Sequence, residues 1–598
     1  MRYSSAYRIY YIKIRCQNHM NSNQQPNIWQ LLYRMICYTP RLYLIDAFFW
    51  LFIIGLPILP GLIIREFFNT LTGESKYNFS PTILIIFLLA TGLGRVIFIF
   101  IGRLTKTQHR FTMSALLRHN LLQAILKRPG AISLPVSPGE LISYFRDDID
   151  LIENNIVGTA EIFDAAIFAF ISVIILANIN WKMTALVFLP LVLVIIVIQQ
   201  MEKRIKRYRR TSRIATEKVT GLIGEIFNSV QAIKVAGAEG SVISHFQELN
   251  EQRRKAVLKD QLFTAILNSN FQNLVNLGTG IILLTAASFL QQGTNNLSVG
   301  DFALFVYYLA FVTEFVTFLG EFIASSKQTE VSFERMTSLV ENQHDSALTL
   351  VAPQPLYLNH IFGQKQQLPQ IKNQADYSTL KSKLQELTIE NLTYHYPGTN
   401  QGIENISFCL PRGSLTVITG GIGSGKTTLL RTLLGLLPLQ SGKIYWNDYL
   451  IDNPSSFFVP PHSAYTPQIP QLFSQTLRDN LLLGWKKTDN DIEKAIHTSV
   501  FDQDVIDMAL GLETLVGYKG VRLSGGQLQR AAIARCLIHQ PELLVFDDIS
   551  SALDIETEKK LWSRLLDKLW DSQWQPTILI VSHREWLLNH ADKVIILE

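Results

Sequence analysis

The sequence predicts an all-α membrane domain with six spanning helices, followed by an α/β domain. Apolar stretches fill the chain up to residue 330, whereas charges and turn residues are spread through the C-terminal third. The chain is 17% charged, and soluble domains carry about 25% charged residues, so part of it belongs in lipid. A glycine-rich loop follows a short apolar run near residue 420. We expect an N-terminal cytoplasmic or interfacial segment at 1–41, the membrane domain at 42–340, a linker at 341–385 and the α/β domain at 386–598.

Six stretches are apolar and long enough to cross a membrane, which takes about 20 residues. They lie at residues 42–64, 83–101, 161–179, 183–199, 265–290 and 302–324. Lys and Arg orient them: residues 203–213 hold seven, whereas residues 69–81 hold only Lys76. Because Lys and Arg collect on the cytoplasmic side, we expect both termini and the α/β domain in the cytosol. The expected location is the inner membrane of a bacterium.

The two long cytoplasmic connections are rich in helix formers with polar faces, so the spanning helices are expected to continue past the membrane. Turns at residues 137–150 and 234–246 are expected to contact the α/β domain, and solvated loops are the alternative. The linker is rich in Gln, Asn and Pro without a sustained period, which predicts a connector that is partly without regular structure.

Six ionisable side chains fall within the expected spans, and such residues usually face a bundle interior or a watery cavity. Glu314 and Glu321 lie seven residues apart and therefore on one helix face, as a cation pathway would require. Pairing with Arg95 or with loop arginines at the membrane edge is the alternative. The six residues are Asp46, Arg95, Glu161, Asp164, Glu314 and Glu321.

Cysteine spacing and the N-terminus exclude other classes of protein. The chain has no C-x-x-C pair, so neither a disulfide framework nor a zinc site is indicated. Residues 1–16 are basic and aromatic and lack the continuous apolar core of a cleaved signal peptide. A start at Met20 would remove most of this segment. The four cysteines are Cys16, Cys37, Cys409 and Cys536.

The segment VITGGIGSGKTTLL predicts a site for nucleotide phosphates. Residues 417–419 read as a strand and residues 428–434 as a helix, with the pattern G-x4-G-K-T between them. Backbone N–H groups at a helix N-terminus cradle phosphates, Lys426 supplies a charge to the β and γ phosphates, and Thr427 offers its hydroxyl to Mg²⁺. The residues predicted to bind ATP here are Gly420, Gly421, Gly423, Ser424, Gly425, Lys426, Thr427 and Thr428.

The segment PELLVFDDIS supplies two acids to the same site. Residues 543–546 have the pattern of a buried strand, and ligands of open α/β sheets gather at the C-terminal ends of strands. Asp547 is therefore expected to hold Mg²⁺ together with Thr427. Asp548 is then free to orient or polarise the attacking water.

The segment LSGGQLQRAAIAR resembles the signature sequence of ATP-binding cassette (ABC) proteins. The other segments of the family occur in the family's order. YTPQIP, with Gln468, resembles the Q-loop, and SALD at 551–554 resembles the D-loop. VSH resembles the switch-histidine segment, with His583 as the histidine, and YHYP contains Tyr396 as the aromatic residue for adenine stacking. The resemblance implies that Gln468 senses the γ-phosphate and binds the metal, and that His583 supports the transition state. It makes Lys426, Gln468, Asp548 and His583 the catalytic set, and Ser524, Gly525, Gly526 and Gln527 the contacts to the ATP of a partner chain.

Six spans ahead of one cassette resemble the exporter branch of the family, in which permease and ATPase are fused. Each nucleotide motif occurs once, so the resemblance implies a half-transporter that pairs with a second copy or a paralogous half-transporter in membrane lipid. We expect an ATP-driven exporter that moves a substrate out of the cytosol or between leaflets. The alternatives are the low-activity subunit of a heterodimer and an ATP-gated channel or regulator, whereas six spans argue against a nucleic-acid partner. The acids of the sixth span hint at cationic amphiphiles, and lipids, peptides and drugs stay open.

Three features depart from the family pattern. Asp548 stands where the family has a catalytic Glu, which draws the carboxylate back by about 1.5 Å and predicts slow hydrolysis, because misplacements of about 1 Å cost roughly a hundredfold. Tyr518 stands where exporters have a Glu in a loop that contacts the permease, so coupling is expected to use aromatic packing or a partner chain with the usual Glu. The sequence stops at VIILE, before the last elements of most cassettes, so we expect either a cut chain or an unusually short domain.

Overall fold

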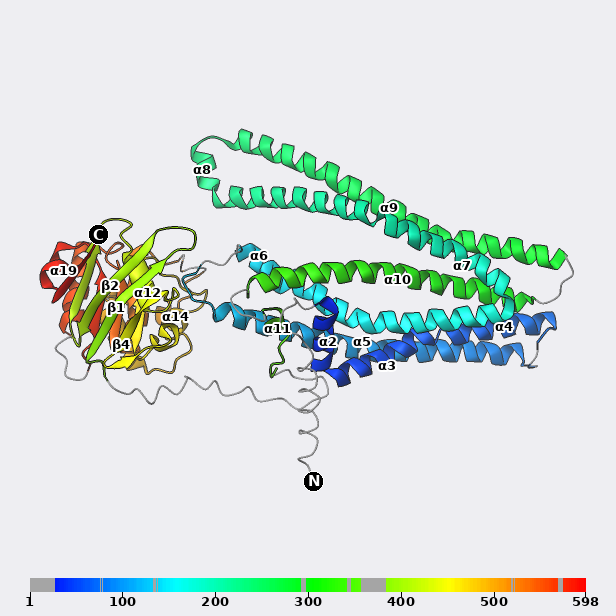
Figure 1. The fold of residues 1–598 in the computed structure, drawn as a ribbon, viewed down its shortest axis with the longest axis horizontal. Coiled ribbons are helices and arrows are strands. Elements are labelled where there is room, and N and C mark those ends of the chain that lie inside the picture. The colour runs from blue at the N-terminus through cyan, green and yellow to red at the C-terminus, as the bar shows by residue number, and fades with distance from the viewer. Residues whose placement is uncertain are drawn as a thin grey trace, which may run out of the picture. The chain divides into compact units, whose positions relative to one another are not determined.

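The computed structural model describes residues 27–75, 77, 79–132, 136, 138–291, 297–340, 346–356, 383–517, 520, 522–567 and 574–598. These residues form two compact units, one helical and one α/β (Figure 1). The predicted fold class, a helical membrane domain followed by an α/β domain, is confirmed. Each unit is built around its own apolar clusters.

The helical unit consists of long helices and a few short ones. Its helices are α2 (Ile28–Tyr38), α3 (Pro40–Gly55), α4 (Ile58–Thr72), α5 (Pro81–Leu126), α6 (Pro138–Ser143), the π-helical turn η1 (Tyr144–Asp148), α7 (Ile149–Asn228), α8 (Val230–Val235), α9 (Glu239–Gln291), α10 (Val299–Ser338) and α11 (Ser346–Leu350). Its 46 residues make α5 about 69 Å long, well beyond the 30 Å of a bilayer core. Spanning helices therefore continue past the membrane, as the connections predict.

Four helical stretches among the described residues are long and apolar enough to span a membrane: Pro40–Thr72, Pro81–Leu126, Gly139–Ala185 and Val299–Ser338. They contain the first, second, third and sixth predicted spans. The fourth and fifth lie on α7 and α9, where many side chains fall outside the described set, and they remain predictions. The predicted turn between the third and fourth spans is a kink at Asn180, whose side-chain oxygen accepts a hydrogen bond from the Met183 N–H at 3.0 Å.

Some of the ionisable side chains in the predicted spans are paired, as the alternative to a cation pathway predicted. Their partners are neither Arg95 nor loop arginines. Asp46 lies 3.3 Å from Nδ1 of His109, and both are fully buried, while Glu161 forms an ion pair with Lys106. Both partners come from α5, next to its apolar span, so α5 supplies the partners of acids on α3 and α7 where loop arginines were expected. Among the described residues, Asp164, Glu314 and Glu321 form no ion pair.

Part of the predicted connector is folded against the helical unit. The side-chain amide of Asn120 donates to the carbonyls of Leu350 and Ala352 at 2.8 and 2.9 Å, and the Tyr38 hydroxyl donates to that of Gln354 at 2.6 Å. Leu350 is fully buried there. The low-complexity composition predicted no such anchoring, because it depends on partners more than 200 residues away. Residues 357–382 lie outside the described part of the chain.

The α/β unit has two sheets. Its strands are β1 (Glu386–His395), β2 (Gly402–Pro411), β3 (Leu415–Gly420), β4 (Ser441–Trp446), β5 (Tyr449–Leu450), β6 (Ser463–Thr466), β7 (Leu543–Asp547), β8 (Thr577–Val581) and β9 (Lys593–Leu597). An antiparallel sheet has the order β2-β1-β4-β5, part of which is visible in Figure 1, and a parallel sheet has the order β6-β7-β8-β3-β9. The parallel sheet is buried on both faces, because Leu544 and Phe546 of β7 join one apolar cluster and Leu543 and Val545 join the other.

Short helices connect these strands and cover the parallel sheet. They are α12 (Lys426–Leu433), α13 (Pro454–Phe457), α14 (Leu477–Leu482), α15 (Asp489–Thr498), α16 (Asp502–Asp507), the 3₁₀ turn η3 (Gly511–Glu513), α17 (Gly525–Leu537), α18 (Ile555–Leu566) and α19 (Glu585–His590). Several begin at a side chain that caps the first turn: Asp554, for example, accepts a hydrogen bond from the Thr557 N–H at 2.9 Å.

A short segment that follows α5 folds as part of the α/β unit. The Ala131 N–H donates to the Leu436 carbonyl at 2.9 Å. Ala131 and Ile132 pack against the apolar cluster that contains the leucines of α12. The predicted contacts were at residues 137–150 and 234–246, and this segment was not among them. The Pro129-Gly130 pair, a turn signal at the end of a long helix, was the feature that could have indicated it.

Candidate nucleotide site

The phosphate loop links the end of β3 to the start of α12, as predicted. Gly420 has φ 145°, and a Cβ there would lie 2.0 Å from the Leu597 carbonyl oxygen, so the position requires glycine. Gly425, at φ 89°, caps the helix that begins at Lys426. The Lys426 ammonium donates to the carbonyls of Gly420 and Gly421 at 2.9 and 2.6 Å, which folds its side chain over the loop. The loop thus places a positive charge beside backbone N–H groups at a helix N-terminus.

Asp547 ends β7 and faces the phosphate loop. The Thr427 hydroxyl donates to its Oδ1 at 3.0 Å, and the Tyr465 hydroxyl donates to its Oδ2 at 3.2 Å. Burial raises the pKa of Asp547, and the two hydrogen bonds oppose that rise. The structure therefore brings together Thr427 and Asp547, two of the three predicted metal ligands. Tyr465, on the neighbouring strand β6, was not predicted, because its position beside Asp547 follows from strand order alone.

Asp548 takes an unusual backbone conformation next to this carboxylate. Its φ of 49° lies in the left-handed region, which Asp tolerates better than most residues. The Gln468 side-chain amide donates to its Oδ2 at 3.2 Å. Such conformations are costly and concentrate at functional sites. The predicted base and the predicted Q-loop glutamine are thus in direct contact.

Two further predicted residues border the loop. Nδ1 of His583 lies 3.3 Å from the Thr419 hydroxyl at the end of β3. The Tyr396 hydroxyl lies 3.3 Å from the Thr428 hydroxyl in the first turn of α12. Both side chains are therefore beside the phosphate loop, where an attacking group and a nucleotide base would be. Their predicted roles concern a bound nucleotide and remain predictions.

The signature residues lie in a separate cluster. Ser524 caps α17: its hydroxyl accepts from the Gln527 N–H at 3.2 Å, and its own N–H donates to the Gln527 side chain at 2.9 Å. Gly526 packs near the Ala552 carbonyl of the D-loop. Within the described residues, no hydrogen bond or ion pair joins Ser524 or Gln527 to the phosphate loop. The side-chain contacts of the signature therefore run within α17 and to α16, whereas Thr427 of the phosphate loop contacts Asp547 of β7.

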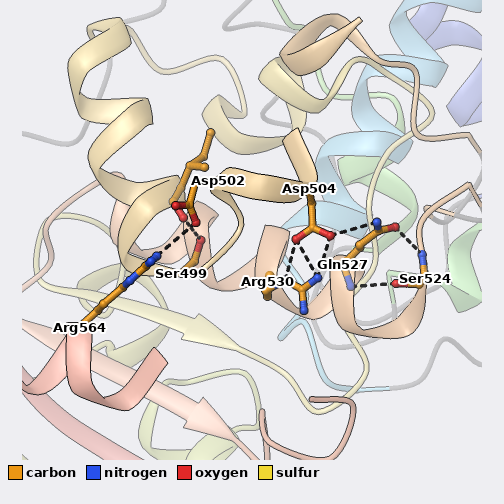
Figure 2. Close-up of polar contacts among 8 residues, drawn as sticks. Ser499, Asp502, Asp504, Ser524, Gln527, Arg530 and Arg564 are labelled. Carbon is orange, nitrogen blue, oxygen red and sulfur yellow. Dashed lines mark hydrogen bonds and ion pairs between the residues drawn. The ribbon is translucent and has the colours of Figure 1, made fainter. Parts of the chain in front are cut away.

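Asp504 of α16 holds the signature helix from the side (Figure 2). It accepts hydrogen bonds from the Gln527 side chain at 3.1 Å and from Arg530, whose Nη2 lies 2.7 Å away. Both members of the ion pair are largely buried, with side-chain exposures of 13% for Arg530 and 18% for Asp504. Asp504 was not predicted, because no local motif marks an acid that lies about 20 residues before the segment it orients.

Replacing Asp504 with Ala is expected to lower ATPase activity by about tenfold, because a charged hydrogen bond to the signature is worth about 1.5–3 kcal/mol. Steady-state ATPase with a thermal-stability measurement tests this. Asp502→Ala is the matched control: Asp502 is on the same helix and pairs with Arg564 at 3.2 Å, away from the signature (Figure 2). Equal losses of activity in the two variants would mean that Asp504 contributes only stability.

A phosphate loop on a parallel α/β sheet, joined to long apolar helices, defines a membrane-bound P-loop ATPase. The family described as ABC transporter matches residues 403–551, and the family described as ABC transporter transmembrane region matches residues 44–315. The two matches together cover most of the chain. The chain belongs to the ABC transporter family, with the permease and the ATP-binding domain in one polypeptide.

Known proteins similar to this chain are exporters. The "Probable multidrug resistance ABC transporter ATP-binding/permease protein" of Bacillus subtilis is 27% identical over 428 residues, 70% of this chain and 67% of that protein. The "ATP-dependent lipid A-core flippase 2" of Colwellia psychrerythraea is 25% identical over 421 residues, 70% of this chain and 66% of that protein. A solved bacterial Atm1-family ABC exporter with ATP bound shares the fold, with a TM-score of 0.75, 18% identity and 94% coverage of both chains.

These relatives confirm the predicted class and activity. The chain is an integral membrane exporter that binds ATP and couples its hydrolysis to transport. The alternative of an ATP-gated channel or regulator is not favoured. Tyr518, the departure predicted in the loop before the signature, lies outside the described residues.

Proposed function

We propose that the chain is one half of a dimeric exporter with two composite ATP sites. Each site would combine the phosphate loop of one chain with the signature of the other. The observation that carries this proposal is the division of contacts within one chain: Gln527 contacts both Ser524 and Asp504, whereas the Thr427 hydroxyl of the phosphate loop donates to Asp547. The partner is a second copy or a paralogous half-transporter.

The residues around Asp547 suit a magnesium ion. Mg²⁺ prefers oxygen ligands, and the Thr427 hydroxyl and the Asp547 carboxylate lie within 3.0 Å of each other. Asp547 is 1% exposed, and a buried carboxylate of this kind gains from a cation nearby. We assign Thr427, Asp547 and Gln468 to the metal, which when bound would neutralise charge on the transferring phosphate.

The remaining residues divide the chemical work. Lys426 would release its loop carbonyls to bind the β and γ phosphates, and Asp548, oriented by Gln468, would accept the proton of the attacking water. His583, which follows β8 and lies beside Thr419 of β3, would stabilise the transferred phosphate. Because Asp548 is one methylene shorter than the family's Glu, hydrolysis would be slow and the ATP-bound dimer long-lived.

Closure of the dimer must be transmitted from the ATP-binding domain to the membrane-spanning helices. Residues 126–132 continue directly from α5 and are fixed to the ATP-binding domain at Leu436, three residues after α12. A shift of α12 on ATP binding would therefore pull on the end of a helix that crosses the bilayer. The proposed setting is a bacterial inner membrane with the ATP-binding domain in the cytosol, because the basic residues 203–213 face that side.

Mixing two inactive variants tests the composite sites. Lys426→Ala lacks a working phosphate loop, and Ser524→Ala lacks a working signature, so each alone is expected to hydrolyse little ATP. A mixed dimer contains one site in which both halves are intact. Co-expressed and reconstituted together, the variants are expected to recover up to about a quarter of wild-type ATPase, because half of random dimers are mixed and each has one site of two.

The control is co-expression of Lys426→Ala with a Lys426→Ala, Ser524→Ala double variant, in which no intact site can form. Recovery in this control would refute the composite site. No recovery in the first mixture, with a wild-type chain active by itself, would refute it as well. A wild-type chain that is inactive alone but active beside a paralogous half-transporter would identify the heterodimer, for which Asp548 is the favouring feature.

A further inference from the structure

The helical unit has a partly open cavity of about 360 Å³, lined mainly by α3, α5, α7 and α10. Ten apolar side chains line it, five of them aromatic, together with Arg95, Arg103, Glu161 and Glu314. Charged side chains are costly at membrane depth and usually mark a substrate or ion path. A cavity with an apolar wall and a few charged groups is suited to a ligand that has an apolar body and a charged end.

One of the two acids that line this cavity forms an ion pair. Glu161 forms an ion pair with Lys106, whose ammonium also lies 4.7 Å from the ring centre of Trp50. Glu314 is then the one lining carboxylate without an ion pair among the described residues. Because Lys106 pairs with Glu161 from outside the lining, the charged lining groups that have no ion pair among the described residues are two arginines and one carboxylate. The balance favours a ligand with negative charge.

Arg95 is positioned by a break in the first span. Pro57 has no N–H, so the helix cannot satisfy the carbonyl of Ile53, four residues earlier. Nε of Arg95 donates to that carbonyl at 3.1 Å. This bond fixes the guanidinium and leaves its two terminal nitrogens without a partner among the described residues. A guanidinium held in this way offers a fork of donors to a phosphate or carboxylate.

Arg103 adds a second donor from the same helix. It lies eight residues further along α5, about 12 Å, and its guanidinium carbon is 5.6 Å from the ring centre of Trp50. Arg95 falls within the predicted span 83–101, and Arg103 lies just past its cytosolic end. In the predicted orientation, the two arginines therefore lie in the inner half of the bilayer and at its cytosolic edge, where a lipid-like ligand would present its headgroup.

We propose that this cavity binds an amphiphile with an anionic headgroup, with Arg95 and Arg103 as headgroup donors and the aromatic side chains against the apolar tail. The inference rests on the proposed export function and names its substrate class. It replaces the cationic amphiphiles that the acids of the sixth span indicated, because Glu314 shares the lining with two arginines and Glu321 does not line the cavity.

Binding without nucleotide tests this separately from ATP hydrolysis. The full chain in phosphatidylcholine nanodiscs is incubated with radiolabelled oleoyl lysophosphatidic acid and competed with oleoyl lysophosphatidylcholine, oleylamine or inorganic phosphate. Lysophosphatidylcholine is expected to compete at least tenfold more weakly than unlabelled lysophosphatidic acid, and oleylamine and phosphate not at all. Arg95→Gln and Arg103→Gln are each expected to weaken binding by about tenfold or more, and Arg95→Lys to regain part of it.

Glu321→Gln is the matched control, because Glu321 is a charged residue of α10 that does not line the cavity. Wild-type affinity in both Arg→Gln variants, or competition by oleylamine equal to that of lysophosphatidic acid, would overturn the proposal. Competition by inorganic phosphate would assign the site to soluble anions and also reject it. ATPase of the same samples separates the two claims: normal ATPase without amphiphile binding rejects the site alone, and arginine-dependent binding without ATPase rejects the composite ATP site alone.

Discussion

Replacing Asp548 with Glu is expected to raise steady-state ATPase activity by about a hundredfold, because the longer side chain moves the carboxylate about 1.5 Å toward the attacking water. The backbone at this position is left-handed, with φ 49°, so the shorter carboxylate cannot be brought forward without changing a strained segment. Gln468 holds the present carboxylate at 3.2 Å, which fixes it close to the backbone. ATP turnover of the purified, reconstituted chain measures the change.

Asp548→Asn is the control for this prediction. It keeps the size of the side chain and removes its basicity, so the remaining hydrolysis is expected to fall to background while ATP binding is retained. Asp548→Glu is also expected to lower the melting temperature slightly, since Glu tolerates the left-handed region less well than Asp. An unchanged ATPase rate in Asp548→Glu would mean that the backbone already compensates for the missing methylene.

Replacing Asp547 with Asn is expected to lower kcat by at least about a hundredfold, because metal-assisted charge stabilisation is worth several kcal/mol. The substitution keeps the shape of the side chain and removes the one buried negative charge that contacts both Thr427 and Tyr465. ATPase rates at several magnesium concentrations measure the loss. Activity that returns to the wild-type level at high magnesium would show that Asp547 affects only metal affinity, contrary to this prediction.

Tyr465→Phe is the matched control for Asp547→Asn. It removes one neutral hydrogen bond, worth about 1 kcal/mol, so a loss of only a fewfold is expected. The same bond lowers the pKa of Asp547 against the effect of burial. Removing this hydrogen bond raises the pKa of Asp547, so the carboxylate becomes protonated at a higher pH. The acid limb of the pH profile of ATPase activity is therefore expected to shift to higher pH. A profile that does not move would mean that another group sets the acid limb.

The sequence predicted the nucleotide site well, because its parts are local. The strand, loop and helix around Lys426 differ from the prediction by only a few residues at their ends, and Asp547 ends the predicted strand. Glycine spacing and apolar runs encode such features directly. Asp504 and Tyr465 escaped prediction, because each acts across a gap in sequence that only packing closes.

The membrane half shows the same division. Apolar length identified the spans, but Asp46 and Glu161 find their partners on α5, and the partner of Arg95 is a backbone carbonyl exposed by Pro57. No pattern within one helix encodes which groups of neighbouring helices meet. The attachment of residues 126–132 to the ATP-binding domain was missed for the same reason.

The sequence by itself determined that this chain is a membrane protein that binds ATP and belongs with fused exporters, since spans and phosphate loops are properties of short contiguous segments. Only the tertiary structure decided which charges in the cavity are already neutralised, and therefore that its wall is positive. The physical reason is that an ion pair depends on distance in space between helices, whereas hydropathy and loop geometry depend on neighbours along the chain.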